Sequence, residues 1–262
     1  MLRGWTGAAV VAALSWVGSP GQAQDLSTLP GAEQYGLRLQ YREYRPSLTG
    51  EAQKGSGDRD GTVVDMVDDL GIADARTFDA RGAIQFKRGW KLRGSYTPLD
   101  YQGDVEAQRA FNYGDTRYAR FDRVVTRIKG SYFSADLEWD FVKGRHGFLG
   151  LIVGAKVFDI DANVLDASIN AREVDTVLAP IPVVGLATRL YAGRLSFEGE
   201  LAGMSAGSRG SAIEAEGSMR IHLSDRLAAM GGYRYLSLDG RDGSDQVKLK
   251  LGGWQFGVEI SL

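Results

Sequence analysis

The chain has 262 residues, a length that suits one large β domain or two small ones. Its 31 Lys and Arg residues nearly balance 33 Asp and Glu residues, and a formal net charge of −2 gives no overall attraction to nucleic acid. Cysteine is absent, which excludes disulfides, thiolate metal sites and cysteine nucleophiles. Glycine is in excess, because 35 residues are about 13% of the chain, against ~7% in ordinary soluble domains.

The first 23 residues have the layout of a secretory signal peptide. Arg3 supplies a positive start, residues 4–18 are mostly apolar, and residues 19–23 form a turn that ends in a small-x-small cleavage motif. We therefore predict that residues 1–23 are a signal peptide and that residues 24–262 form the mature domain. An N-terminal membrane anchor is the alternative, but the apolar stretch is shorter than the ~20 residues of a spanning helix.

Beyond Gln24, apolar and polar residues alternate with period two, which predicts strands rather than helices. In residues 35–42, for example, Leu37 and Leu39 share one face while Arg38 and Gln40 share the other. Ten segments follow this pattern: residues 35–42, 78–87, 90–97, 133–141, 149–157, 184–191, 195–202, 213–221, 227–238 and 254–262.

Short and longer connections alternate between these segments. Residues 88–89, 143–147, 192–194 and 223–226 are tight turns, whereas residues 46–76, 99–123, 159–179, 205–211 and 239–245 are mostly longer and polar. This rhythm is typical of an up-and-down antiparallel barrel, and an even number of strands places both termini at the tight-turn end.

The polar face of these strands is densely charged, and the two signs segregate by strand. A soluble barrel would bury the apolar face, whereas a transmembrane barrel turns that face to lipid and the polar face to the lumen. Opposite walls of a barrel can pair such charges. We therefore predict an all-β fold: a single up-and-down antiparallel transmembrane β-barrel of about ten strands, with eight as the alternative. The predicted lumen charge network is Arg38, Arg42, Arg81, Arg93, Asp136, Glu138, Glu198, Glu200, Glu214 and Glu216.

Buried charges must be paired, so these residues predict a largely closed lumen, with a narrow polar pore as the alternative. Aromatic residues near the strand ends predict two girdles at the membrane interfaces. They are Tyr35, Phe86, Trp90, Trp139, Phe141, Phe148 and Tyr191 at the tight-turn end, and Tyr41, Phe78, Tyr96, Phe158, Tyr233 and Tyr235 at the other.

Glycines fit inside such strands. Gly150 and Gly154 are expected to make room in the lumen, and Gly82, Gly94, Gly199 and Gly217 to face lipid. At residues 252–253 the apolar phase slips from Leu249 and Leu251 to Trp254 and Phe256, which predicts a β-bulge.

The chain resembles the outer-membrane β-barrel proteins of Gram-negative bacteria. The resemblance rests on the secretory start, the hairpin rhythm and the final amphipathic strand, with Trp254, Phe256, Val258, Ile260 and Leu262 on one face. It implies an outer-membrane location, with lipid and lipopolysaccharide around the barrel and the barrel-insertion machinery as a partner during biogenesis. In the family this strand usually ends in Phe or Trp, not in Leu. The resemblance names no substrate and leaves the oligomeric state open.

Candidate chemistry is sparse. Barrel enzymes that the chain resembles place a His beside Ser or a carboxylate at the outer rim, whereas His146 and His222 fall at the tight-turn end. We therefore predict no catalytic residue, no cofactor and no metal ligand, hence a non-enzymatic barrel with a structural, small-solute or surface-interaction role. The alternatives are a barrel enzyme acting on lipid A or peptides, and a soluble periplasmic barrel that binds an apolar ligand.

Three loop features carry weaker predictions. Asp-rich residues 55–74 and 239–245 suit Ca²⁺ or Mg²⁺, although solvated turns explain them better. Residues 63–70 are predicted to form a short helix over or inside the barrel mouth. A basic and aromatic stretch suits lipopolysaccharide phosphates or a plain hairpin, and its location argues against nucleic acid. This stretch contains Arg109, Phe111, Tyr113, Arg117, Tyr118, Arg120, Phe121 and Arg123.

Overall fold

The computed structural model describes residues 33, 35–57, 60–207 and 210–262. The predicted signal peptide, residues 1–23, lies outside the described residues. Within them, no helix is long and apolar enough to cross a membrane.

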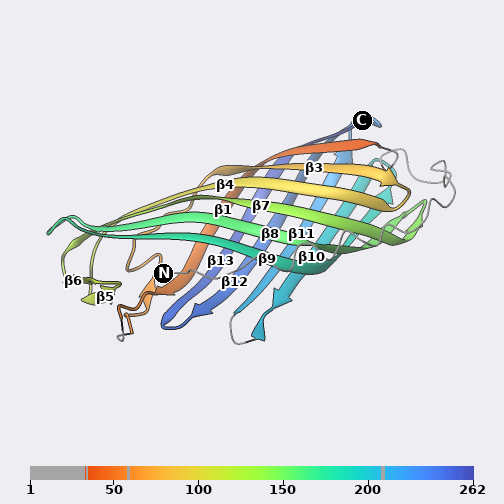
Figure 1. Ribbon diagram of the computed structural model, residues 1–262. Coiled ribbons are helices and arrows are strands. Elements are labelled where there is room, and N and C mark those ends of the chain that lie inside the picture. Colours follow the sequence, from red (N-terminus) through yellow and green to blue (C-terminus); the bar gives the residue numbers. More distant parts are fainter. Residues whose placement is uncertain (1–32, 34, 58–59, 208–209) are drawn as a thin grey trace.

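The described residues form a closed antiparallel barrel of ten long strands, as predicted (Figure 1). Each strand pairs with its neighbours along the barrel wall, and β13 pairs with β1 from Arg38–Ser261 to Gln53–Gln246, which closes the sheet. Closure gives the backbone groups of the first and last strands partners that an open sheet would lack. The long strands are β1 (Leu37–Gln53), β3 (Thr77–Lys87), β4 (Trp90–Glu106), β7 (Arg123–Gly144), β8 (Gly147–Asp166), β9 (Ala171–Ala192), β10 (Leu195–Ser205), β11 (Gly210–His222), β12 (Leu227–Asp242) and β13 (Asp245–Ser261).

Strand length varies strongly around the wall. Strands β7, β8 and β9 have 22, 20 and 22 residues, whereas β10 has 11. The predicted connection at residues 159–179 is therefore wrong, because β8 and β9 pair throughout it except at the turn between Asp166 and Ala171. Polar residues on the outer face, such as Asp159 and Asp161, hid the alternation with inward Ile160. Figure 1 shows these hairpins extending far from the tight-turn end.

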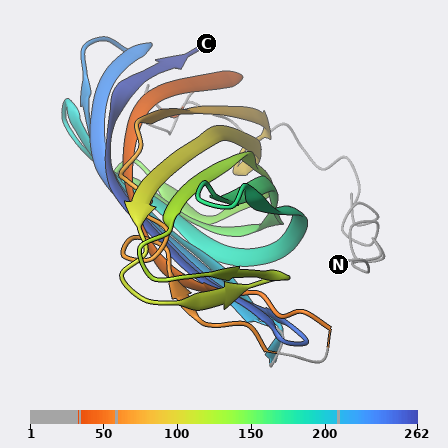
Figure 2. The same ribbon diagram turned by 90° about the vertical axis from the view of Figure 1, so that its left-hand side faces the viewer.

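Three short strands lie among the long connections. Strand β2 (Val64–Asp65) pairs with the end of β1, and β5 (Phe111–Tyr113) pairs with β6 (Thr116–Tyr118) in a separate hairpin. Figure 2, viewed toward the long-hairpin end, shows this yellow-green hairpin lying at that end of the barrel.

The two faces of the wall have the predicted polarity. Leu39, Ile84 and Phe197 on the outer face are 45%, 51% and 47% exposed, whereas Arg42 and Arg220 on the inner face are fully buried. Several girdle aromatics are indeed exposed on the outer face, among them Phe86, Trp139, Phe141, Tyr41, Tyr96, Tyr233 and Tyr235.

Four predicted girdle residues instead lie inside the barrel: Phe148, Phe158 and Tyr191 occupy the inner phase of their strands, and Tyr35 precedes β1. Tyr35, Phe148 and Phe158 are buried, and Tyr191 donates a hydrogen bond to Glu33 inside the barrel. Aromatic type and position near a strand end cannot separate lipid-facing from lumenal rings, because only the strand phase decides the direction.

The predicted bulge at residues 252–253 is wrong. The registers of β13 with β12 and with β1 both run through Gly252 and Gly253 without a shift. Leu249 and Leu251 point into the barrel, and the apparent slip arises because the interior changes from apolar to polar along the strand. Register shifts occur instead beside two tight turns, between Gln85 and Lys87 and between Asp140 and Val142.

Candidate functional site

The half of the lumen near the tight turns holds a dense set of buried charges, here called the charge network. All ten predicted lumen residues line this part of the inner face. The network also contains charges that the predicted set omits: Glu33, Asp79, Lys91, Asp140, Lys156, Arg189, Arg220, Arg234 and Glu259. Except for Glu33, which precedes the first strand, their positions follow the same alternation, so strand phase alone could have found them.

Asp79 on β3 is one centre of this network. It accepts hydrogen bonds from Arg42 Nε at 2.9 Å, from Arg234 Nη1 at 3.1 Å and from Thr97 Oγ1 at 2.7 Å. Arg81 Nε lies 3.1 Å from the same carboxylate. Since β12 carries Arg234, this centre joins strands that are not neighbours in the wall, and it therefore spans the lumen.

Glu259 on β13 is a second centre, nearer the tight turns. Its carboxylate accepts hydrogen bonds from Gln40 Nε2 and from Arg220 Nε, each at 2.8 Å. Arg189 Nη1 lies 3.2 Å away and Arg38 Nε lies 3.4 Å away. Three cations from β1, β9 and β11 thus converge on one carboxylate.

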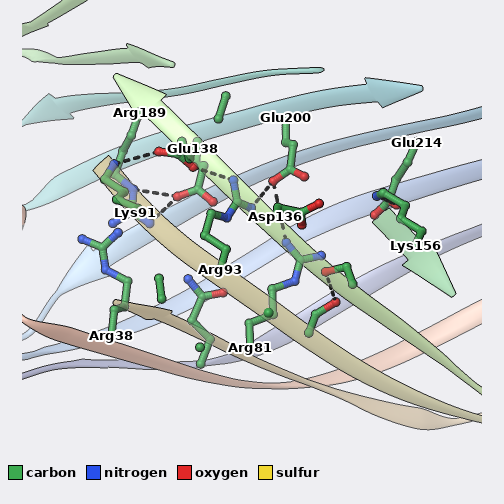
Figure 3. A pocket seen from close by; sticks show the side chains of 18 of the residues that line it. Arg38, Arg81, Lys91, Arg93, Asp136, Glu138, Lys156, Arg189, Glu200 and Glu214 are labelled. Atoms are coloured by element: carbon green, nitrogen blue, oxygen red, sulfur yellow. Dashed lines mark hydrogen bonds and ion pairs between the residues drawn. The ribbon is translucent and has the colours of Figure 1, made fainter. Parts of the chain in front are cut away.

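Glu138 and Glu214 are two further carboxylates of the charge network that bind side chains of other strands (Figure 3). Glu138 accepts hydrogen bonds from Lys91 Nζ at 2.8 Å and from Arg93 Nη1 at 2.6 Å. Arg93 also binds Glu200 on β10, across the lumen. Glu214 likewise receives hydrogen bonds, from Arg234 Nε at 2.8 Å, from Tyr132 OH at 2.6 Å and from Lys156.

Glu33 lies at the tight-turn end of the charge network. Its carboxylate lies 3.0 Å from Arg38 Nη2, 3.6 Å from Lys91 Nζ and 3.5 Å from Arg189 Nη1, and Tyr191 OH donates to it at 2.5 Å. Glu33, four residues before the start of β1, therefore lies inside the barrel among cations from three strands.

Little space is left among these side chains. The cavity that they line has a volume of about 40 Å³, room for a few water molecules and not for a larger solute. Gly150 contributes to the fit, because a Cβ there would lie 2.8 Å from Asp140 Oδ1. At Gly154 a Cβ would overlap the Asp136 carboxylate, so both glycines make room for inward carboxylates, as expected.

The other half of the lumen is apolar, contrary to the expectation of a polar interior throughout. We call this cluster the apolar cap. Inward side chains of six wall strands meet the side chains of residues 64–72 and of the β5–β6 hairpin. Its buried members are Leu48, Ala52, Val64, Met66, Leu70, Ile72, Leu99, Tyr101, Ala107, Phe111, Tyr113, Tyr118, Val124, Tyr132, Phe158, Val164, Leu236 and Leu251. The long strands β7 and β8 contribute Val124, Tyr132, Phe158 and Val164 to this core.

Residues 63–70 do lie in the barrel mouth, but the predicted helix is wrong. The segment forms β2 and then a single turn, in which the Asp65 carboxylate accepts hydrogen bonds from the backbone N–H groups of Val67 and Asp68. Gly71 ends the turn at a φ of +67°, and the Ile72 N–H donates to the Met66 carbonyl at 3.0 Å. The Asp65 carboxylate thus caps the start of the turn as at a helix N-terminus, and the left-handed backbone of Gly71 ends it before a helix forms.

The β5–β6 hairpin bridges the mouth. The Phe111 and Tyr118 rings stack with centroids 4.7 Å apart, and Tyr118 OH donates to the Val164 carbonyl at 3.2 Å. At the far wall, Glu173 accepts hydrogen bonds from Asp115 N and Thr116 Oγ1, each at 3.0 Å.

The basic and aromatic stretch is therefore divided between the cap and the surface. Arg109 pairs with Asp69, and Arg123 pairs with Asp104. Phe111, Tyr113 and Tyr118 are buried in the cap, whereas Arg117, Arg120 and Phe121 are exposed.

Asp69 and Arg109 hold the turn under the hairpin. Arg109 donates to both carboxylate oxygens, at 3.0 and 2.5 Å. Burial raises the pKa of Asp69, but hydrogen bonds from Arg109 and from the Asp65 backbone outweigh burial and lower the pKa below its ordinary value. The carboxylate is thus favoured by folding, and its contribution is complete above about pH 3.9 and lost as the pH falls through the lowered value.

We expect Asp69→Asn to increase amide hydrogen exchange in residues 66–72 at pH 7, since the charged hydrogen bonds are lost. The half-exposed Arg109 limits the change in local opening free energy to about 1 kcal/mol or less. The native chain should show a comparable increase only in acid, after correction for intrinsic exchange rates. Unchanged exchange in the variant would contradict this role for the pair.

The histidines lie away from the cap. His146 occupies the tight turn between β7 and β8, and His222 ends β11, where its Nε2 lies 2.9 Å from Ser196 Oγ. Within the described part of the chain, no three His, Asp or Glu side chains gather as a metal ion requires. Asp58, in one Asp-rich loop, lies outside the described residues.

Comparison with known proteins places this architecture. No protein-family model and no curated protein sequence matches the chain. Its structure is similar to that of the outer membrane protease OmpT from Escherichia coli, with a TM-score of 0.56 and 8% identity over 92% of this chain and 100% of that chain. The chain has the fold of the Gram-negative outer-membrane β-barrels. At this identity the likeness concerns the fold alone.

Two further outer-membrane barrel structures are more distant. The translocator domain of the autotransporter NalP from Neisseria meningitidis has a TM-score of 0.47 and 11% identity over 88% of this chain and 91% of that chain. Ail, the attachment invasion locus protein of Yersinia pestis, has a TM-score of 0.34 and 11% identity over 86% of this chain and 96% of that chain.

Proposed function

We propose that the protein is a non-enzymatic barrel of the outer membrane whose lumen is closed, and that it acts as a structural or surface-interaction protein. The observation that carries the proposal is the filling of the lumen at two successive levels. The charge network occupies the half near the tight turns, and the apolar cap occupies the half under the long hairpins. A solute would have to displace both.

Location supports this proposal. The outer face carries exposed apolar residues, and the resemblance to secreted barrels implies export through the signal peptide at residues 1–23. Outer-membrane lipid and lipopolysaccharide would then surround the wall, and the barrel-insertion machinery would be a partner during assembly.

The placement of the histidines supports a non-enzymatic role. A general base must lie within hydrogen-bond reach of its substrate. His146 and His222 both lie at the tight-turn end, whereas substrates from outside would meet the long hairpins. An assay of the purified barrel against peptides and lipid A tests this point, and turnover that survives replacement of both histidines would point to another catalytic group.

Conductance in planar bilayers tests the closed lumen. We expect no stable current steps from the native barrel, because paired charges and apolar side chains leave no continuous water path. A known porin reconstituted in the same way provides the positive control. Stable steps of substantial current in the native protein would overturn the proposal.

The filling of the lumen at two levels also predicts whether a shortened variant conducts. A variant that lacks residues 62–74 loses the part of the cap that enters the mouth, but the charge network below remains complete. We therefore expect this variant to stay non-conducting.

A further inference from the structure

The four tight turns of the barrel carry a surplus of positive charge. They join β3 to β4, β7 to β8, β9 to β10 and β11 to β12, so they are spread around one end of the closed wall. Asp225 is the single carboxylate in these turns. We call the cations of the turns the basic rim: Lys87, Arg88, Lys143, Arg145, Arg194 and Arg226.

Four members of the basic rim are exposed, and none of these four forms an ion pair within the described part of the chain. They are Lys87, Arg145, Arg194 and Arg226. Exposed cations toward the long hairpins are placed differently, since Arg123 pairs with Asp104 and Arg127 pairs with Asp100. The charge of the rim is therefore available to a partner outside the chain.

Two of the turns are held against each other. Lys143 Nζ donates to the Arg88 carbonyl at 3.0 Å, which fixes the β7–β8 turn beside the β3–β4 turn. Both turns thus present their cations from a fixed backbone.

The basic rim borders the lipid-facing surface directly. The outer-face residues beside the four turns are Phe86, Val142, Leu195 and Leu227, and all of them are exposed. Phe86 directly precedes Lys87, and Leu195 directly follows Arg194. Long basic side chains at such a border keep their stems on apolar surface and extend their charges to the level of the lipid head groups.

This combination of features favours a lipid as the partner. Lysine and arginine both bind phosphate, and a guanidinium group can donate to two phosphate oxygens at once. A soluble acidic partner would meet the cations but not the apolar residues beside them. A phospholipid meets both, because its head group and its acyl chains lie at successive depths of the membrane.

We propose that the basic rim binds the head groups of anionic phospholipids in the leaflet where the tight turns lie. Each turn offers at least one exposed cation to a head group, and the apolar residue beside it contacts the acyl chains of the same lipid. The proposal rests on the outer-membrane location proposed above.

Spin-labelled lipids test this preference. The barrel is reconstituted in phosphatidylcholine vesicles with a trace of phosphatidylglycerol or phosphatidylcholine that carries a nitroxide on its acyl chain. Lipid in contact with the protein gives a motionally restricted spectrum, and its fraction yields the association constant of one lipid relative to the other. One Lys or Arg near an anionic head group strengthens binding about fivefold, and averaging over all lipid positions around the wall reduces the expected preference for phosphatidylglycerol to about twofold. The preference should disappear in about 1 M salt, which screens the charges.

A fourfold variant removes the exposed charges of the rim: Lys87→Gln, Arg145→Gln, Arg194→Gln and Arg226→Gln. We expect it to bind the two lipids equally. The matched control removes one lysine and three arginines elsewhere on the outer surface: Lys248→Gln, Arg45→Gln, Arg123→Gln and Arg127→Gln. It should keep the native preference. The shift in electrophoretic mobility between folded and heated barrel monitors folding, and if the fourfold variant does not fold, its substitutions are made two at a time.

Other results overturn the proposal. Equal association of both lipids with the native barrel would do so, as would a preference that the fourfold variant retains. Equal association together with rim-dependent co-sedimentation with purified peptidoglycan would assign the charges to an acidic polymer instead. If no lipid is motionally restricted by the native barrel, the membrane location itself fails, which separates the two proposals.

Discussion

Asp79→Asn is expected to lose about 3–5 kcal/mol of its free energy of unfolding, the cost of breaking a buried ion pair by removing one partner. Asp79 is fully buried and meets Arg42, Arg81 and Arg234. Asparagine keeps the shape of the side chain but removes the charge, so three guanidinium groups retain Glu214 and Glu216 as their remaining shared counter-ions.

Denaturant unfolding of the barrel in lipid vesicles measures this loss, with the midpoint compared at equal slope. Asp104→Asn is the matched control, because it breaks a pair whose carboxylate and guanidinium side chains are 52% and 66% exposed. Exposed pairs contribute little, so this control should unfold like the native chain. Equal midpoints for Asp79→Asn and the native barrel would show that the network does not depend on this carboxylate.

Strand number and the inner face could be predicted from sequence because one physical rule governs both. A wall with lipid outside and charges inside forces period-two alternation, so each arginine or carboxylate in the polar phase marks the lumen. Arg38, Arg93 and Glu214 all follow that rule. The ion-pair partner of each charge, by contrast, could not be predicted from the sequence. Asp79 meets Arg234 because of the stagger between distant strands, which no local pattern encodes.

The apolar cap escaped prediction for a related reason. Toward the long-hairpin end, the inner face of the barrel is apolar and much of its outer face is polar, so the alternation continues with its meaning reversed. Leu249 and Leu251 then look like a slip in phase, and Asp159 and Asp161 look like a loop. Glu33 gave no signal, because a single carboxylate before the first strand belongs to no alternating pattern.

The completeness of the wall also changes between the two levels. Strands β10 and β11 are short, so β9 continues beyond Val184 without a ladder partner on the β10 side among the described residues. The charge network below has all ten strands around it. The two levels of the barrel therefore differ in how completely paired strands surround them.

Substitution of a glycine where β1 and β13 pair to close the barrel has the second large expected effect on stability. Gly257 on β13 lies opposite Arg42 on β1, and a Cβ there would overlap the Tyr41 carbonyl and lie 2.8 Å from the Arg42 Cα. Backbone atoms cannot give way as a flexible side chain can. We expect Gly257→Ala to lose about 1–3 kcal/mol of unfolding free energy, the usual cost of overpacking.

Gly217→Ala is the matched control for this substitution. Gly217 lies in β11, and a Cβ added there meets nothing within 4 Å. Alanine should then stabilise the barrel by about 0.4–1 kcal/mol, because it restricts the unfolded chain without a clash in the folded one. Unfolding midpoints in lipid vesicles should therefore move in opposite directions for the two variants. If they move together, close approach at the β1–β13 seam is not what requires glycine at position 257.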